Sequence, residues 1–289
     1  MSSLVEEYVC IAPYTSMKVG GPVRYLCRPE TAEDLIGLLR EHASDPTPPL
    51  VVGNASNILF PDRGYDGCVI LTGGIRGLSV SDEGVITAMA GESLSALSRF
   101  AMENGRGGLS FAYGIPGTVG GGVYMNAGAY GGQISDCLCK AVCADANGML
   151  SVLTAEDLCF SYRKSALQSR PLVLISASFA CPEGDPADIR AEMDRNMAAR
   201  KEKQPLEFPS CGSVFKRPEG NFAGRLIEQA GLKGYSVGGA QVSQKHAGFI
   251  INTGGATSAD VRNLIRHVQE TVERMSGILL EPEVCILPD

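Results

Sequence analysis

The sequence has no long hydrophobic run. Its apolar runs stop after a few residues, as at Leu172–Ile175, whereas a helix that spans a bilayer needs about 20 predominantly apolar residues. The first ten residues carry Glu6 and Glu7 where a secretory signal would carry basic side chains, and no apolar core follows them. These two absences predict a cytoplasmic protein that is neither exported nor held in a membrane.

Runs of basic residues are also missing. The formal net charge is −7, which together with the absence of a basic run argues against general nucleic-acid binding. Hydrophobic residues make up 44% and charged residues 20% of the chain, an ordinary globular composition that argues against disorder. An acidic protein can still line one cleft with arginine and lysine, so an anionic small molecule stays an admissible ligand.

The chain has ten cysteines but no metal-ligand spacing around them. Without an export signal, reduced thiols are expected rather than a disulfide framework. The densest cluster is Cys137, Cys139 and Cys143, which has no CxxC spacing, no flanking histidine and no fourth ligand nearby. If residues 137–145 form a strand, the three odd positions share one face and become small buried groups. No metal site is predicted.

Short segments with helix and strand signals follow one another irregularly. Helices are expected from Thr31 to His42, from Ser93 to Asn104, from Asp185 to about Lys203, over Phe222–Ala230, and from Ser258 until Gly277. Strands are expected at Leu50–Val52, Cys68–Leu71, Val85–Ala90, Cys137–Ala144, Leu172–Phe179 and Gly248–Asn252. Without strict alternation of strand and helix, the pattern favours an α+β fold.

A composition shift at residues 181–186 marks the expected domain boundary, because a turn-rich stretch there precedes a long polar helix. The predicted parts are a first region over 1–182 with two α+β subdomains, a second domain over 183–279, and a C-terminal strand over 280–289.

Two glycine-rich loops stand out among the 35 glycines. One is VVGNASNIL at 51–59, and the other is GIPGTVGGG at 114–122, followed by VYMNAGAYGG. Backbone without side chains lets N–H groups approach a phosphate, and the hydroxyls of Ser56 and Thr118 add donors. A diphosphate cofactor is the predicted ligand of these loops. The alternative is that the glycines only permit tight turns. The GxxxxGK[ST] and strand-GxGxxG-helix motifs are absent, which argues against a Rossmann-type NAD dehydrogenase.

An ordered series of motifs carries a family resemblance across nearly the whole chain. The series comprises PYTSMKVGGP at 13–22, GNASN, GIPGTVGG, MNAGAYGG, SYRKS at 161–165, CGSVFKRP at 211–218, AGLKG at 230–234, GGAQVSQKHAGF at 238–249 and LEPEV at 280–284. It resembles the UDP-N-acetylenolpyruvoylglucosamine reductases. The stretch between Arg163 and Lys203 is short, which resembles the group that lacks a loop with a lid tyrosine, so no lid tyrosine is expected.

The resemblance implies an FAD-binding fold of the vanillyl-alcohol-oxidase (PCMH) type, followed by a smaller α/β substrate-binding domain. It also implies reduction by NADPH of the enolpyruvyl ether of UDP-N-acetylglucosamine to UDP-N-acetylmuramate, for peptidoglycan synthesis, by a monomer. The implied FAD-binding residues are Gly53, Asn54, Ala55, Ser56, Asn57, Ile115, Pro116, Gly117, Thr118, Gly120, Gly121, Asn126, Ala127 and Gly128.

The chemistry of that reaction suits three further residues. Hydride from flavin N5 reaches the methylene carbon, an enolate develops beside a carboxylate, and a proton must reach the α-carbon. Arg163 offers a guanidinium fork to the carboxylate. By motif position Ser213 is the proton donor, and Glu283, in the apolar run 278–287, assists when protonated or orients Arg163, since burial raises a carboxyl pKa.

Four other positions match family positions that line the substrate or its diphosphate: Lys203, Lys216, Arg217 and His246. Tyr162, which precedes Arg163, is expected to stack on the substrate or to hydrogen-bond to it. Ala55 replaces a glycine common in the first loop, which could crowd the diphosphate slightly. Cys211 replaces a small Ala or Ser beside the expected proton donor; it is either a reserve acid, an oxidation-sensitive thiol or a tolerated small residue.

Two other functions fit parts of the same pattern. An FAD-dependent alcohol or sugar-lactone oxidase would share the fold, but neither glycine loop holds a histidine for covalent flavin attachment, and Ser213 and Glu283 have no role in it. A non-enzymatic nucleotide-sugar-binding protein would be favoured by loss of Arg163, Ser213 or Glu283, and all three are present.

Overall fold

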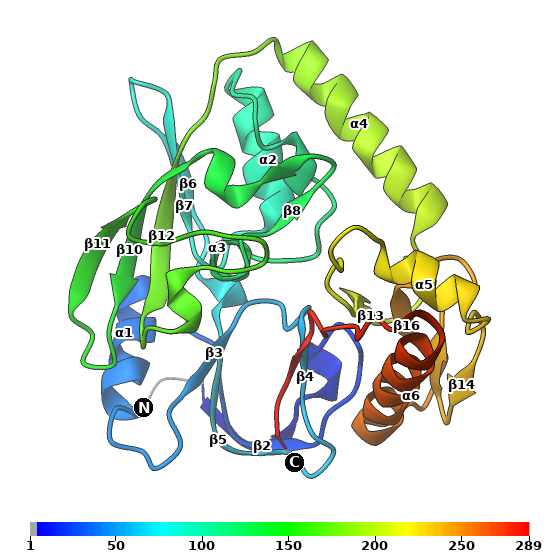
Figure 1. Ribbon diagram of the computed structural model, residues 1–289. Helices are drawn as coiled ribbons and strands as arrows, with labels where there is room; N and C mark the ends of the chain where they lie inside the picture. Colours follow the sequence, from blue (N-terminus) through cyan, green and yellow to red (C-terminus); the bar gives the residue numbers. More distant parts are fainter. Residues whose placement is uncertain (1–4, 289) are drawn as a thin grey trace. The chain divides into compact units, whose positions relative to one another are not determined.

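The computed structural model describes residues 5–288 and divides the chain into two compact units (Figure 1). Unit 1 contains residues 5–7, 25–54 and 67–200, and unit 2 contains residues 8–24, 55–66 and 201–288. Both units mix helices with sheets, so the α+β expectation is confirmed. Within the described residues no helix is long and apolar enough to span a membrane.

The larger sheet of unit 1 has five strands in the order β11-β10-β12-β7-β6, paired antiparallel throughout. Helices α2 and α3 pack beside it, and the fully buried Ile86, Leu97, Val123 and Phe179 belong to the shared core. The elements are β6 (Leu78–Val80), β7 (Val85–Met89), α2 (Leu94–Glu103), α3 (Val119–Tyr124), β8 (Gly128–Ala129), β9 (Gly132–Gln133), β10 (Leu138–Ala144), β11 (Leu150–Thr154) and β12 (Val173–Ala180).

A four-stranded sheet has the order β1-β2-β5-β3, formed by β1 (Val5–Cys10), β2 (Pro22–Cys27), β3 (Leu50–Val52) and β5 (Tyr65–Leu71). The division between the units runs through β1, β2 and β5. Helix α1 (Ala32–Glu41) buries Leu35 and Leu39 against Cys27 and Ile70. It begins as predicted, because the Thr31 side chain accepts from the Asp34 N–H and Asp34 caps the Thr31 N–H in return.

Helix α4 (Pro186–Lys203) passes from one unit to the other, since the division falls after Arg200. The boundary expected near residue 182 lies inside unit 1. Its turn is fixed there by backbone hydrogen bonds from Gly107 N to Pro182 O (2.8 Å) and from Gly184 N to Gly105 O (3.0 Å). Ile189 and Met193 then bury the first half of α4 in unit 1. A turn-rich sequence here marks a surface turn within the unit.

Unit 2 holds the sheet β13-β16-β15-β14 with α5 and α6, and a parallel pair of β4 and β17. Its elements are β4 (Ile58–Leu59), β13 (Ser210–Ser213), α5 (Ala223–Gln229), β14 (Ser236–Val237), β15 (Ala240–Val242), β16 (Phe249–Asn252), α6 (Ser258–Ser276) and β17 (Cys285–Ile286). Asp62 accepts from the N–H groups of Ser258 (2.7 Å) and Ala259 (2.8 Å). This carboxylate satisfies free donors in the first turn of α6.

Five short 3₁₀ turns complete the described chain: Ala12–Tyr14, Thr72–Gly74, Ser110–Ala112, Ile134–Asp136 and Ala166–Gln168. One strand prediction needs correction. Cys137 and Cys143 are buried, but Cys139 is only partly buried and its Sγ lies 3.3 Å from Ser178 O. The pairing of β10 with β12 shifts between Leu138 and Lys140, and such a bulge breaks the period of two on which the prediction rested.

Candidate active site

The first glycine loop presents unused backbone donors. Within the part of the chain that the structure describes, no N–H group of residues 54–57 donates a hydrogen bond to the protein. Ala55 is only 4% exposed and has φ +44°, a left-handed conformation that favours glycine. A turn with a left-handed residue and unused N–H groups is an arrangement suited to binding a phosphate. Residues 53–57 therefore fit the diphosphate of FAD.

The second glycine loop uses its backbone donors internally. Thr118 caps α3 through the Gly121 N–H, while Val119 N and Gly120 N donate to Glu92 O and Ala90 O, each at 2.8 Å. A Cβ on Gly120 would lie 3.1 Å from Ala90 O, and one on Gly122 would lie 3.0 Å from Leu94 Cδ2. Close packing therefore requires glycine at these two positions, and helix α3 is an element that the sequence did not predict.

The two loops touch at Gly53 and Thr118. A Cβ built on Gly53 would lie only 2.1 Å from Thr118 Oγ1 and 3.0 Å from its Cγ2. Because β3 and the N-terminus of α3 both belong to unit 1, this approach is a fixed feature of that unit. Only glycine allows the first loop to lie against the second.

Gly53→Ala should yield a folded protein that loses flavin. The added methyl group would displace Thr118, uncap α3 and widen the loop, so the retained FAD should fall by about tenfold or more. The measurement is the flavin-to-protein absorbance ratio after purification, with Kd determined by adding FAD. Gly37→Ala is the matched control, because its Cβ in α1 would have no heavy atom within 4 Å; normal flavin retention by Gly53→Ala would contradict the contact argument.

Arg163 stands at the tip of a tight hairpin in unit 1. Ser161 and Lys164 pair through reciprocal backbone hydrogen bonds of 3.0 and 3.1 Å, which leaves Tyr162 and Arg163 as the turn residues. Arg163 has φ +56°, an uncommon conformation for a residue other than glycine. Its Nη2 donates to Gly128 O at 3.0 Å, and the guanidinium carbon lies 5.0 Å from the Tyr162 ring centroid.

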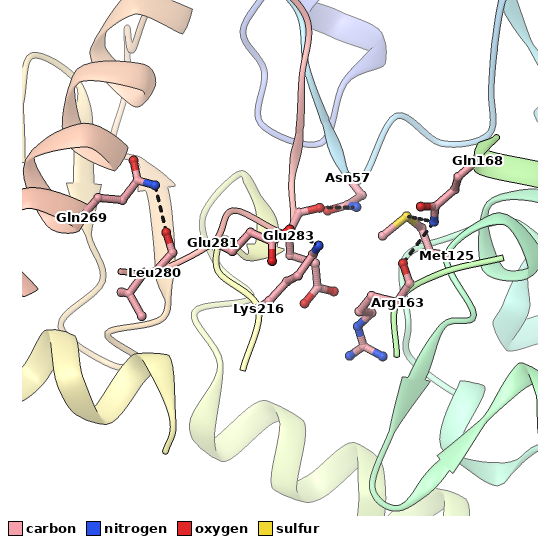
Figure 2. A network of polar contacts seen from close by, with 9 residues as sticks. All are labelled: Asn57, Met125, Arg163, Gln168, Lys216, Gln269, Leu280, Glu281 and Glu283. Carbon is pink, nitrogen blue, oxygen red and sulfur yellow. Dashed lines mark hydrogen bonds and ion pairs between the residues drawn. The ribbon is translucent and has the colours of Figure 1, made fainter. Parts of the chain in front are cut away.

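Two amide side chains brace this hairpin. Gln168 Nε2 donates to the Arg163 carbonyl at 3.0 Å and to Tyr124 O at 2.9 Å, and approaches Met125 Sδ at 3.6 Å (Figure 2). Asn126 Nδ2 donates to Ser161 O at 3.1 Å. The amide of Asn126, a residue expected at the cofactor, thus also supports the base of the hairpin. Neither bracing role was visible in the sequence, because each depends on contacts between distant segments.

Ser213 and Glu283 are brought together in unit 2. Gly212 has φ +75°, and the pairing of β13 with β16 is irregular between Ser210 and Ser213. Ser213 Oγ lies 3.4 Å from Phe215 O, and Glu283 N donates to Val214 O at 2.7 Å. The predicted proton donor and the predicted carboxyl therefore lie on directly paired backbone segments.

The end of the first glycine loop reaches the same place. Asn57 Nδ2 donates to Glu283 O at 3.1 Å (Figure 2), and β4, which follows Asn57, pairs in parallel with β17, which follows Glu283. Within unit 2, the segment 280–284 therefore contacts both Asn57, at the end of a loop expected at the cofactor, and the segment around Ser213, expected at the substrate.

His246 lies next to Ser213 across a glycine. A Cβ on Gly248 would lie 3.2 Å from both His246 Nδ1 and Ser213 Oγ. His246 Nδ1 accepts from Gly248 N at 3.1 Å, so this nitrogen carries no proton. Burial lowers the pKa of His246, which is therefore neutral at pH 7. The bare Gly248 is a site feature that the sequence reading missed.

The expected cationic residues of the substrate site have partners of their own. Lys216 forms an ion pair with Glu281 (Figure 2), and Arg217 lies over the Phe222 ring at 3.9 Å from its centroid. Lys203 is exposed at the last position of α4. Lys216 and Arg217 follow Ser213 along the chain and therefore lie close to it. Lys203 is assigned to the site only by its motif position.

Cys211 belongs to the core of unit 2. Its side chain packs among Val214, Phe215 and their neighbours, with Sγ 3.7 Å from Ile58 O. Burial raises the pKa of the Cys211 thiol to about 12, and the thiolate is the reactive form of cysteine. Among the three interpretations of this residue, the tolerated small residue is the one that its surroundings support.

Known proteins match both parts of this arrangement. Residues 23–154 match the FAD binding domain family, and residues 204–287 match the C-terminal domain of UDP-N-acetylenolpyruvoylglucosamine reductase. The reductase of that name from Lactobacillus delbrueckii subsp. bulgaricus is 46% identical over 283 residues, which are 98% of this chain and 95% of the relative. One from Streptococcus pneumoniae is 49% identical over 276 residues, 95% of this chain and 91% of the relative.

The crystal structure of UDP-N-acetylenolpyruvylglucosamine reductase from Thermus caldophilus superposes with a TM-score of 0.83 at 36% identity, covering 98% of this chain and 99% of that one. The chain belongs to the UDP-N-acetylenolpyruvoylglucosamine reductase family. As a member it is an FAD-dependent, NADPH-using reductase of peptidoglycan precursor synthesis, and the predicted fold, enzyme class and cofactors are confirmed.

Proposed function

We propose that this member of the family reduces the enolpyruvyl ether of UDP-N-acetylglucosamine to UDP-N-acetylmuramate, with Ser213, Arg163 and Glu283 as its catalytic residues. The observation that carries the proposal is the backbone hydrogen bond from Glu283 N to Val214 O, which pairs the segment that carries the carboxyl with the segment that carries Ser213. An oxidase or a nucleotide-sugar carrier has no use for this pair.

FAD, when bound, accepts hydride from NADPH and supplies it to the methylene carbon of the substrate. The chain's own contribution is electrostatic and acid catalysis. The Arg163 guanidinium stabilises the carboxylate and the negative charge that develops as the double bond is lost. The Ser213 hydroxyl gives its proton to the α-carbon, so that one hydride and one proton are added across the bond. Glu283 orients these groups or assists as an acid.

The positions of the remaining polar groups support the same assignment. The unused N–H groups of 54–57 are suited to the FAD diphosphate, and Lys216, Arg217, Lys203, Tyr162 and His246 are assigned to the nucleotide-sugar substrate. The neutral His246 next to Ser213 carries its proton on Nε2 and can donate one hydrogen bond there without adding charge at the developing enolate. We further propose that the reaction takes place in the cytoplasm, that the active form is a monomer, and that no lid tyrosine between residues 163 and 203 is needed.

An anaerobic absorbance titration tests the proposed function. Purified protein should show an oxidised flavin spectrum that bleaches when NADPH is added and returns when UDP-N-acetylglucosamine enolpyruvyl ether follows, without oxygen. One substrate equivalent should be consumed for each flavin reoxidised. A bleached flavin that ignores this substrate but reoxidises in air would indicate an oxidase and overturn the proposal.

A further inference from the structure

A second cluster of reactive side chains lies in unit 1, apart from every residue assigned above. Cys27 ends β2, Cys68 lies on the neighbouring strand β5, and His42 follows the last turn of α1. Cys27 and Cys68 are fully buried and His42 is 8% exposed. One donor atom from each residue lies within 4.8 Å of the other two, and no other histidine, cysteine or carboxylate trio gathers so closely within residues 5–288.

The imidazole of His42 is held in a fixed orientation. Its Nδ1 lies 2.7 Å from Asp45 Oδ2, and the Tyr25 ring packs against it at a tilted centroid distance of 5.9 Å. With Nδ1 engaged by the carboxylate, Nε2 is the nitrogen left for a ligand. A carboxylate on the second nitrogen of a histidine is the usual support of a metal-binding imidazole, because it fixes the tautomer and raises ligand basicity.

We propose that Cys27, Cys68 and His42 bind one zinc ion, with Asp45 orienting the histidine. Two thiolates and a neutral imidazole supply the nitrogen and sulfur ligands that zinc prefers. Their two negative charges balance the divalent cation, whereas a monovalent soft cation would leave a net charge on buried ligands. The fourth position is left to a water molecule.

The sulfur spacing suits a shared metal better than a disulfide. The two Sγ atoms lie 3.4 Å apart. Zinc–sulfur bonds of about 2.3 Å at a tetrahedral angle require roughly 3.8 Å, so binding needs an opening of only a few tenths of an ångström. A disulfide requires about 2.05 Å and thus a much larger closure. The metal would link the end of α1 to two strands of the sheet.

Cobalt substitution of the FAD-loaded enzyme is the sharpest test, because cobalt in a tetrahedral thiolate site absorbs in the red, beyond oxidised flavin. We expect about one Co²⁺ per chain, competed away by Zn²⁺ and followed also by mass spectrometry of the metal. Cys68→Ser and His42→Gln should each weaken binding by about 100-fold or more, and Asp45→Asn by about 10–100-fold. Flavin content reports whether each variant is folded.

The matched control is Cys137 with Cys181, two other buried thiols of unit 1. Their double replacement by alanine should leave metal binding unchanged. The proposal is overturned if cobalt gives no red absorption, if His42→Gln and Cys68→Ser bind metal as the wild type does, or if intact-mass analysis of fresh protein shows Cys27 and Cys68 joined as a disulfide.

Discussion

Replacement of Ser213 by alanine should leave the reduction of flavin by NADPH at its wild-type rate and slow reoxidation by the enolpyruvyl substrate by about 10²–10⁴-fold, the range for loss of a general acid. The two half-reactions separate because only the second one needs a proton at the substrate α-carbon. Stopped-flow flavin absorbance measures each rate in turn. Substrate Kd should change little, since the hydroxyl acts on the transition state.

The structure makes this variant easy to interpret. Among residues 5–288 the only hydrogen bond that Ser213 Oγ donates is long, at 3.4 Å to Phe215 O, so its removal should cost little stability. Ser210→Ala is the matched control, because Ser210 lies at the other end of the same strand β13. If Ser213→Ala slowed both half-reactions equally, the defect would lie in flavin binding or folding. Unchanged reoxidation would remove Ser213 from the mechanism.

Helices α1, α2 and α6 were predictable from this sequence, because a local signal marks one end of each. The side chains of Thr31 and Ser93 cap α1 and α2, and Gly277 ends α6 in the left-handed conformation. Each signal lies within a few residues of the feature that it determines. The strands β1, β2, β6, β11 and β13 lack such signals, and the bulge at Cys139 depends on a register with β12 that no local pattern encodes.

The catalytic residues could be predicted through family motifs, but their local supports could not. Gly248 looks like any other turn glycine, yet it allows His246 and Ser213 to approach. Gln168 holds the Arg163 carbonyl from a 3₁₀ turn that no motif marks. Likewise Cys27, His42 and Cys68 have no metal-ligand spacing, because a sheet and a helix terminus bring them together. What sequence reasoning misses here is long-range contact.

Like Ser213→Ala, Arg163→Gln should slow the reoxidation of flavin by substrate and not its reduction by NADPH. Unlike the serine variant, it should recover part of its activity when a positive charge is returned to the position. Loss of the guanidinium should slow reoxidation by about 10²–10³-fold, as removal of one preorganised donor does, and should also raise substrate Kd, because the carboxylate is bound before reaction. Flavin reduction by NADPH should stay unchanged. Stopped-flow rates and substrate titrations of the oxidised enzyme measure the two effects separately.

Arg163→Lys separates charge from geometry. A lysine keeps the positive charge but has no planar fork, and it cannot reproduce the bond from Nη2 to Gly128 O that aims the guanidinium. Reoxidation by Arg163→Lys should therefore fall between the wild type and Arg163→Gln. Lys164→Gln removes a charge from the same hairpin and should leave both half-reactions intact. Any residue at 163 except glycine meets the same strained backbone, with φ +56°, so the two Arg163 variants share a conformation. Equal losses in Arg163→Gln, Arg163→Lys and Lys164→Gln would assign the effect to the hairpin rather than to the guanidinium.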